Sequence, residues 1–374
     1  MYSQQELDDA VASGVISAEA ADALRAHVEG QRSSVIADEE QFRLLTGFND
    51  IFVSIAAAIL LFAVGWIGQS IGQSAGLMIS EHGEGGPSFI APLAVAATAW
   101  PLALFFTARR RMALPSILLL LAFVGGVLMT SAFGLVQVIG ADRFNDNSQL
   151  LPATVGGISA AIAAAAAWLH WRRFHVPITV AAGAAAVAGL FLAVVVAIVQ
   201  PGDTESAKNL ILGFVLLLGI GVFLFAMWWD ASDRTRTTRR ADVAFWLHLL
   251  AAPMIAHPIF TLIGLNNGAV GTGEALLVVG LYVLFGLTAL AIDRRALLVS
   301  ALAYVLYALT ELFKQFGAVE LNVALTALII GSALLLLSAY WHQARGLVVR
   351  RLPSNLQERL PTLDRSAHVS QQAA

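Results

Sequence analysis

The chain has 374 residues, of which 58% are hydrophobic and only 13% are charged, and its formal net charge is −3. A soluble domain carries about a quarter of charged residues, so this chain cannot cover a water-facing surface. Its mean hydropathy of +0.76 excludes a disordered chain and a nucleic-acid-binding protein, and its lack of cysteine excludes a disulfide scaffold. The composition predicts an integral membrane protein in contact with the lipid bilayer.

Residues 1–48 form an acidic segment before the first long apolar run, with three arginines against nine acidic residues. The segment lacks the apolar core that a cleaved signal peptide has near its start, so we expect it to stay on the protein. The pattern predicts a helix over about 4–12 that stops at Gly14, and a second helix that Ser17 caps and Gly30 ends. We expect a cytoplasmic helical appendage that docks on the membrane domain or on a cytoplasmic protein. Its negative charge argues against nucleic acid.

Ten runs of apolar residues follow the appendage. A helix needs about 20 apolar residues to cross the ~30 Å hydrocarbon core of a bilayer, and the runs are close to that length except the third, which is longer. The sequence therefore predicts an all-α, polytopic transmembrane domain over 49–343, with spans at 51–71, 89–107, 113–139, 152–171, 176–199, 208–229, 242–264, 274–292, 296–315 and 321–343.

Lysine and arginine positions predict the orientation of these spans, because cytoplasmic loops retain positive residues. If the N-terminus is inside, the outer loops hold only Arg143, Lys208 and Lys314, which leaves 19 of the 22 basic residues on the cytoplasmic side. This pattern predicts an even number of spans with both ends cytoplasmic. Twenty arginines against two lysines are typical of GC-rich bacterial genes, which favours a bacterial cytoplasmic (inner) membrane.

Two short stretches resemble a known group of proteins. Gly14–Ala21 reads Gly-Val-Ile-Ser-Ala-Glu-Ala-Ala, and Phe133–Gln137 reads Phe-Gly-Leu-Val-Gln. Together with the helical pair and the many spans, they resemble a broad group of bacterial membrane proteins that carry a short N-terminal helical segment and have no known function. The chain lacks the aromatic residue of that group directly after Val138. The resemblance implies a cytoplasmic-membrane protein and no particular activity.

One short motif raises an enzymatic alternative. Gly157-Ile158-Ser159, at the outer start of the fourth span, is similar to the serine motif of rhomboid-type intramembrane proteases, although Ala160 stands where that family has glycine. An intramembrane serine hydrolase is therefore a remote alternative. The sequence contains no Walker loop, zincin pair or dinucleotide fingerprint. We expect no cofactor and no metal, and we favour a protein without enzymatic activity over an enzyme.

The seventh span contains an unusual number of histidines and prolines, namely His248, Pro253, His257 and Pro258. Each proline removes a backbone hydrogen bond, which predicts a kink or a break in the helix. Broken helices often line transport sites. The two histidines are nine residues apart and about half a revolution out of phase, so a shared metal ion is not expected. For His248 we expect a core histidine with its hydrogen bonds satisfied.

The ninth span carries a polar stripe on one helical face, formed by Ser300, Tyr304, Tyr307, Glu311 and Lys314. Polar groups in a bilayer are costly, so this face must meet protein or water. Glu311 lies 16 residues past Arg295, and His257 lies 16 residues past Ala241, which puts both about 24 Å from the cytoplasmic edge. We therefore predict one outward-opening polar cavity that contains His257, Glu311, Tyr304, Tyr307, Lys314 and Gln137.

The C-terminal residues 344–374 carry five arginines against two acidic residues, which predicts a basic, largely flexible cytoplasmic tail. Trp341, just before the tail, is typical of an interfacial anchor. The sequence as a whole predicts a transporter-like or channel-like protein. The alternative is a non-transporting scaffold or assembly factor, in which Lys314 snorkels to the interface and the other polar groups only fix helix packing. A water-accessible cavity at Glu311 and His257 would favour transport, and a dry core would favour the scaffold.

Overall fold

The computed structural model describes residues 10–24, 48–79, 85–144, 149–200, 204–234, 236, 238–263, 272–315 and 322–363. Within these ranges the chain is helical and has no strand. It divides into two compact units, one formed by Met1–Arg43 with Thr362–Ala374 and the other by Leu44–Pro361. The second unit contains long apolar helices, which confirms the predicted all-α multi-pass membrane protein.

In the smaller unit, the structure describes two short helical segments, 10–12 and 18–24. Gly14 has a φ of +72°, a left-handed conformation that glycine adopts without strain, and it lies in the turn after the first segment. Ser17 caps the second segment, because its Oγ accepts a hydrogen bond of 3.1 Å from the backbone N–H three residues later. The predicted stop and the predicted cap are confirmed, whereas Gly30 lies outside the described residues.

Eight helical segments of the larger unit are long and apolar enough to cross a membrane. They match the first eight predicted spans, and the third has the predicted limits. The eight are α3 (Phe48–Ser74), α4 (Ile90–Ala103) with the π-helix that continues it (Leu104–Arg109), α5 (Ala113–Ile139), α6 (Leu150–Phe174), α7 (Ile178–Val199), α8 (Thr204–Ala231), α9 (Arg239–Leu262) and α10 (Thr272–Ile292).

The last two predicted spans are less regular. α11 (Ala296–Gln315) has an apolar part, Ala296–Thr310, that is shorter than a full crossing. α12 (Asn322–Ala339) and α13 (Trp341–Val349) are bent by 77° and qualify as a span only as a pair. A 3₁₀ turn at Ala141–Phe144 and a short helix α14 at Ser354–Gln357 complete the described elements. All ten predicted spans are thus helical, but the last two do not meet the crossing length as single straight helices.

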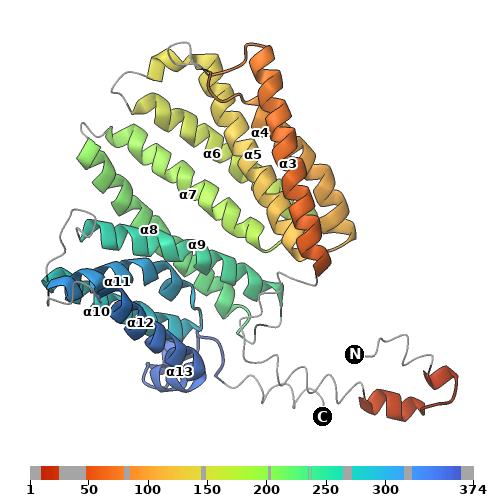
Figure 1. Cartoon of the computed structure of the whole chain (residues 1–374), viewed down its shortest axis with the longest axis vertical. Coiled ribbons are helices and arrows are strands. Elements are labelled where there is room, and N and C mark those ends of the chain that lie inside the picture. Colours follow the sequence, from red (N-terminus) through yellow and green to blue (C-terminus); the bar gives the residue numbers. More distant parts are fainter. Residues whose placement is uncertain are drawn as a thin grey trace. The chain divides into compact units, whose positions relative to one another are not determined.

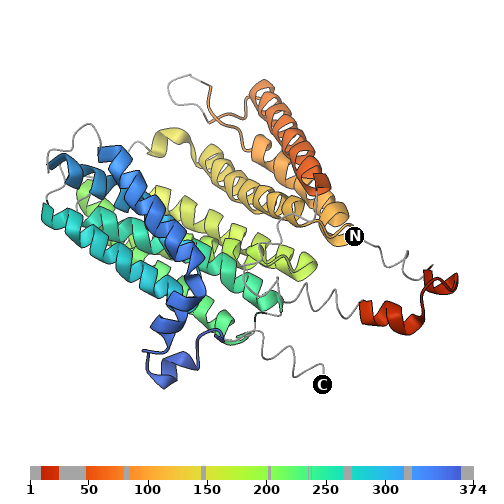
Figure 2. The ribbon, with the colours of Figure 1, turned by 60° about the horizontal axis from the view of Figure 1, so that its bottom comes forward.

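The membrane helices lie side by side in a row (Figure 1). α3 packs against α4 and α5, and the row continues through α6 and α7 to α9, which packs against α8 and α11. α10 and α12 then pack against α11, and Figure 2 shows the same order from a second direction. None of the main interfaces among the described residues joins α3–α5 directly to α8–α13. In the described part of the chain, the main contacts between the two ends of the row therefore pass through α6 and α7.

The largest buried apolar cluster lies among α9–α13, where Phe260 is fully buried. α8 packs closely on α9, because Gly219 leaves no room for a side chain: a Cβ there would lie 2.8 Å from the Cβ of Met254. α10 and α11 form a tight hairpin whose turn contains Asp293 with a φ of +57°. These hairpins bring together the ends of α8–α11 that the arginine distribution places on the cytoplasmic side, and we call them the inner ends.

Candidate functional site

The structure brings two residues of the predicted polar cavity into contact. His257 on α9 and Tyr304 on α11 form a hydrogen bond between Nδ1 and Oη of 2.5 Å. The Tyr304 ring also stacks on Phe260, with 4.6 Å between the ring centroids. His257 itself is exposed at the surface of the helix row. Its imidazole therefore meets a partner on the ninth predicted span, at the depth where the sequence places Glu311.

For the other predicted cavity residues, the structure describes no contact with this pair. The side chains of Glu311 and Lys314 lie outside the described residues. Tyr307 is 42% exposed. Gln137 is on α5, which packs against α3, α4, α6 and, to a lesser extent, α7, and has no main interface with α9 or α11. The shared polar cavity thus stays a prediction, and the His257–Tyr304 contact is the part that the structure describes.

The two prolines of the seventh predicted span both lie inside one helix. α9 runs from Arg239 to Leu262 as a single α-helix that includes Pro253 and Pro258. The chain is therefore not divided into two helices at either proline, so the predicted break does not occur, while the alternative prediction of a kink stays a prediction. The freed backbone carbonyls are accommodated within a continuous helix, and Pro258 is buried against its neighbours.

A second polar site lies at the inner ends of α8–α13 and was not foreseen from the sequence. We call it the ionic cluster. It contains two carboxylates, three guanidinium groups and an imidazole, contributed by α8, the α8–α9 connection, α9, the α10–α11 turn and α13. Its members are Asp230, Arg236, His248, Asp293, Arg294 and Arg345.

Asp230, in the last turn of α8, is the centre of the ionic cluster and is completely buried. Arg294 donates to both of its carboxylate oxygens, from Nη2 at 2.7 Å and from Nε at 3.4 Å. His248 Nε2 lies 3.1 Å from Oδ2, and Arg236 Nε lies 3.7 Å from Oδ1. One carboxylate thus connects three other segments of the chain, and Arg294 also donates to the carbonyl of Ala241 at the start of α9.

Asp293 is the second carboxylate of the cluster. Arg236 Nη1 donates to its Oδ2 at 3.0 Å, and the indole N–H of Trp341 donates to its Oδ1 at 2.8 Å. Arg345 Nε approaches Oδ1 at 3.8 Å. Trp341 is only 3% exposed, so the prediction of an interfacial anchor is wrong: its ring packs inside the helix row, and the Arg295 guanidinium lies 4.8 Å from the ring centroid.

The C-terminal segment folds onto the same site. Arg234 Nε donates to the carbonyl of Leu360 at 2.9 Å, and Arg345 Nη2 donates to the carbonyl of Pro361 at 2.6 Å. Leu360 is buried in the apolar cluster of α9–α13. The prediction of a largely flexible tail is therefore wrong for 344–361, because two arginines counted as solvated topology signals instead hold the backbone of this segment.

His248 fulfils the predicted role of a core histidine only in part. It is 3% exposed and bonded through Nε2 to Asp230, whereas its Nδ1 has no hydrogen-bond partner among the described residues. An imidazole that donates from Nε2 leaves Nδ1 as an acceptor without a donor. His248 and His257 have different partners, and no group of three His, Asp or Glu side chains in the described part of the chain is arranged to hold a metal ion.

The serine-hydrolase alternative gains no support from the helix packing. Ser159 on α6 is 1% exposed, and its hydroxyl has no hydrogen-bond partner among the described residues. α6 packs against α5 and α7 and has no main interface with α9, which carries His248 and His257. The histidine on its own helix, His170, bonds instead to Thr179 at 3.3 Å. Among the residues that the structure describes, none is therefore placed as an activating base for Ser159.

One sequence signal for the ionic cluster does exist. Asp230, Asp233 and Asp293 interrupt inner loops that are otherwise rich in arginine, and Asp293 is followed directly by two arginines. The orientation of the spans depends only on the positive residues. Acidic residues at the inner ends therefore indicate ion pairs with the arginines there. The partners themselves could not be assigned, since they are up to 64 residues apart in the chain.

No model of a known protein family matches the chain, and no curated protein or solved structure matches it. The resemblance at Gly14–Ala21 and Phe133–Gln137 therefore stays a prediction.

Proposed function

We propose that this multi-pass membrane protein is transporter-like and that the ionic cluster closes its inner side. The observation that carries the proposal is the complete burial of Asp230 between two guanidinium groups and an imidazole from three other segments. Ionisable residues inside a membrane protein are rare and commonly belong to substrate or ion pathways. A carboxylate that connects separate helices is also a natural element of a conformational switch.

The energetics favour a switch over a simple stabilising contact. Removing charges from water costs several kcal/mol per ion, so a buried ion pair is on average no more stable than well-packed apolar residues in its place. Once one partner is lost, however, the remaining charge is strongly destabilising. In the proposed switch, the cluster holds the inner ends together in one state, and in the other state the inner ends separate and the charged groups take up water. Transporters use such two-state interfaces for alternating access.

The proposed path runs between α9 and α11, above the ionic cluster. His257 and Tyr304 are bonded across this interface, and the predicted stripe continues from them through Tyr307 to Glu311. With the inner ends held together by Asp230 and Arg294, substrate would enter from the opposite side. A small polar or ionic solute is the class that suits a histidine, a tyrosine and a carboxylate.

A non-transporting scaffold is the second candidate, and one observation favours it. The C-terminal segment is bonded to Arg345 of the ionic cluster and to Arg234 beside it, which adds a further constraint on the inner ends. A scaffold needs a static cluster, whereas a transporter needs one that opens. Movement of the inner ends therefore distinguishes a transporter from a scaffold.

The test uses the natural absence of cysteine from the chain. A single cysteine at Ala252, which is completely buried in the middle of α9 in the apolar cluster shared with α11, reports whether water reaches the α9–α11 interface. In inside-out vesicles we expect it to resist a membrane-impermeant thiol reagent in the otherwise unchanged protein. Asp230→Asn should make it reactive, because Arg294 and Arg236 lose their shared counter-charge.

Two controls make this result specific. Asp142→Asn changes an exposed aspartate outside the cluster and should leave Ala252→Cys unreactive, and Ala188→Cys on α7 should stay unreactive beside Asp230→Asn. Arg236→Gln, which removes a weaker partner of Asp230, should open the site to a smaller extent. A folded Asp230→Asn protein in which Ala252→Cys stays protected would contradict the transporter proposal and favour the scaffold. Labelling at both Ala252 and Ala188 would show general loosening and would contradict it as well.

A further inference from the structure

We infer that the membrane domain also binds one phospholipid, whose acyl chain occupies an apolar groove between α5, α6, α7 and the start of α8. The groove has a volume of about 620 Å³, within the range of about 300–1,000 Å³ that is typical of small-molecule sites. Of its 18 lining residues, only Gln149 has a polar side chain. This inference uses a different part of the chain from the ionic cluster and does not depend on transport.

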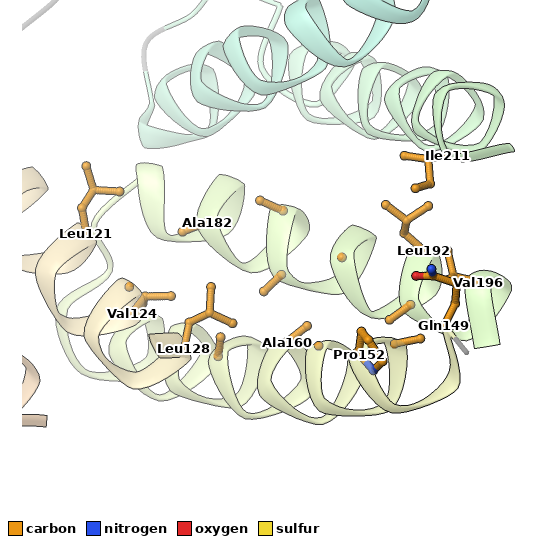
Figure 3. Close-up of a pocket in the computed structure, with 18 residues that line it drawn as sticks. Leu121, Val124, Leu128, Gln149, Pro152, Ala160, Ala182, Leu192, Val196 and Ile211 are labelled. Atoms are coloured by element: carbon orange, nitrogen blue, oxygen red, sulfur yellow. The ribbon is translucent and has the colours of Figure 1, made fainter. Parts of the chain in front are cut away.

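The groove runs along the helices and therefore along the direction in which lipid chains lie. Its α7 wall extends from Ala182 to Val196, which is about 21 Å at 1.5 Å per residue. One leaflet of the hydrocarbon core is about 15 Å deep, so the groove accommodates the full depth of one chain. Figure 3 shows Leu121 and Ala182 towards one end and Gln149, Val196 and Ile211 towards the other.

Small residues create the space. The α6 and α7 walls consist largely of alanine and glycine, which leave a hollow where larger side chains would fill the interface. A Cβ added at Gly125 on α5 or at Gly156 on α6 would meet no atom within 4 Å. The hollow at these two positions is therefore open space and not a close helix–helix contact.

Polar groups gather at one end only, the end predicted to face outward. Gln149 lies at the start of α6, whose N-terminus carries the positive end of a 25-residue helix dipole. Lys208 lies one turn before Ile211, on the same face of α8, and its side chain is 45% exposed and forms a loose ion pair of 3.9 Å with the more exposed Glu205. Lys208 is one of only three basic residues on the predicted outer side. A cation above an apolar groove is complementary to a lipid phosphate above its acyl chain.

The test is native mass spectrometry of the purified full chain with dioleoylphosphatidylglycerol, and with dioleoylglycerol, which has the same chains and no phosphate. We expect one phosphatidylglycerol molecule to remain bound when other lipids are stripped. Gly156→Leu should reduce the retained fraction about tenfold, because the new side chain displaces at least two lipid methylenes. Gly125→Leu, on the opposite wall, should give the same loss. Gly280→Leu, on an exposed face of α10 with nothing within 4 Å, is the matched control and should have no effect.

Lys208→Gln tests the contribution of the lipid headgroup separately from that of the acyl chain. It should lower retention of phosphatidylglycerol several-fold, towards the level of dioleoylglycerol, and should leave dioleoylglycerol unchanged. Unchanged phosphatidylglycerol retention in both groove variants, with melting temperatures like that of the parent protein, would overturn the site. Equal effects of Lys208→Gln on both lipids would overturn the assignment of the phosphate. If Gly156→Leu instead converts a dimer to a monomer and leaves lipid retention unchanged, the occupant is a helix of a second copy.

Discussion

Asp230 is the residue on which the ionic cluster depends most. Its carboxylate is completely buried and has a bidentate contact with Arg294, a contact with His248 and a longer one with Arg236. Asp293, by comparison, is 8% exposed and shares its bonds between arginines and the indole of Trp341. Loss of Asp230 would therefore remove the carboxylate that the buried Arg294 guanidinium contacts, whereas Arg236 would keep its contact with Asp293.

We expect Asp230→Asn to lower the free energy of unfolding by about 3–5 kcal/mol, the typical cost of removing one partner from a buried ion pair. The asparagine keeps the shape of the side chain, so the loss reports on charge and not on packing. Thermal and denaturant unfolding of the protein in detergent measure it. Asp142→Asn, at an exposed turn, should change stability by less than about 0.5 kcal/mol. Equal, small effects of the two substitutions would mean that the cluster contributes little.

At the scale of elements, the α8–α9 hairpin determines where the cluster forms. Asp230 lies in the last turn of α8. Thr238 is the N-cap of α9, and its hydroxyl accepts a hydrogen bond from the backbone N–H of Arg240. Asp233 in turn accepts from both the N–H and the hydroxyl of Thr238, at 2.9 and 2.7 Å. The connection is thus fixed by its own side chains. Close packing of the two helices, through Gly219, then holds Asp230 beside His248.

Gly219 and Gly221 offer a matched pair of substitutions on α8. A Cβ at Gly219 would come within 3.0 Å of both backbone and side-chain atoms of Met254, whereas a Cβ at Gly221 would meet nothing within 4 Å. Gly219→Ala should therefore push α8 from α9 and destabilise the protein by about 1–3 kcal/mol. Gly221→Ala should be neutral or stabilising by up to about 1 kcal/mol, because alanine favours the helix. Unfolding of both variants in one detergent checks this, and similar values would contradict the close α8–α9 contact.

At the scale of the whole molecule, hydropathy was sufficient to locate the helices but not their interactions. Apolar runs near 20 residues have one stable form in lipid, so the first eight spans were predictable, as were the stop at Gly14 and the cap at Ser17. The arginine counts predict the orientation of the helices in the membrane, but they cannot distinguish a solvated arginine from one that bonds across the bundle. Arg234, Arg294 and Arg345 belong to the second kind, and their partners are set by the order of helices in the row.

The orientation is itself a prediction that fusion reporters test. Alkaline phosphatase joined after residue 235 should be inactive, because the α8–α9 connection is predicted to be cytoplasmic, and a fusion after residue 270 should be active. A cytoplasmic reporter at the same two positions should give the opposite pattern. Activity of the phosphatase after residue 235 would place the ionic cluster on the outer side and reverse the direction of the proposed path.

The central claim, that the ionic cluster is a contact that opens, is tested most directly by a distance measurement at the inner ends. Spin labels on Arg239→Cys in α9 and Gln343→Cys in α13, both exposed positions, report the separation of the segments that the cluster joins. Double electron–electron resonance should give one narrow distance for the intact cluster and a second, longer population in Asp230→Asn. A control pair at Phe52 and Leu93, on α3 and α4, should be the same in both proteins. A folded Asp230→Asn protein with one unchanged distance between Arg239 and Gln343 would contradict the account.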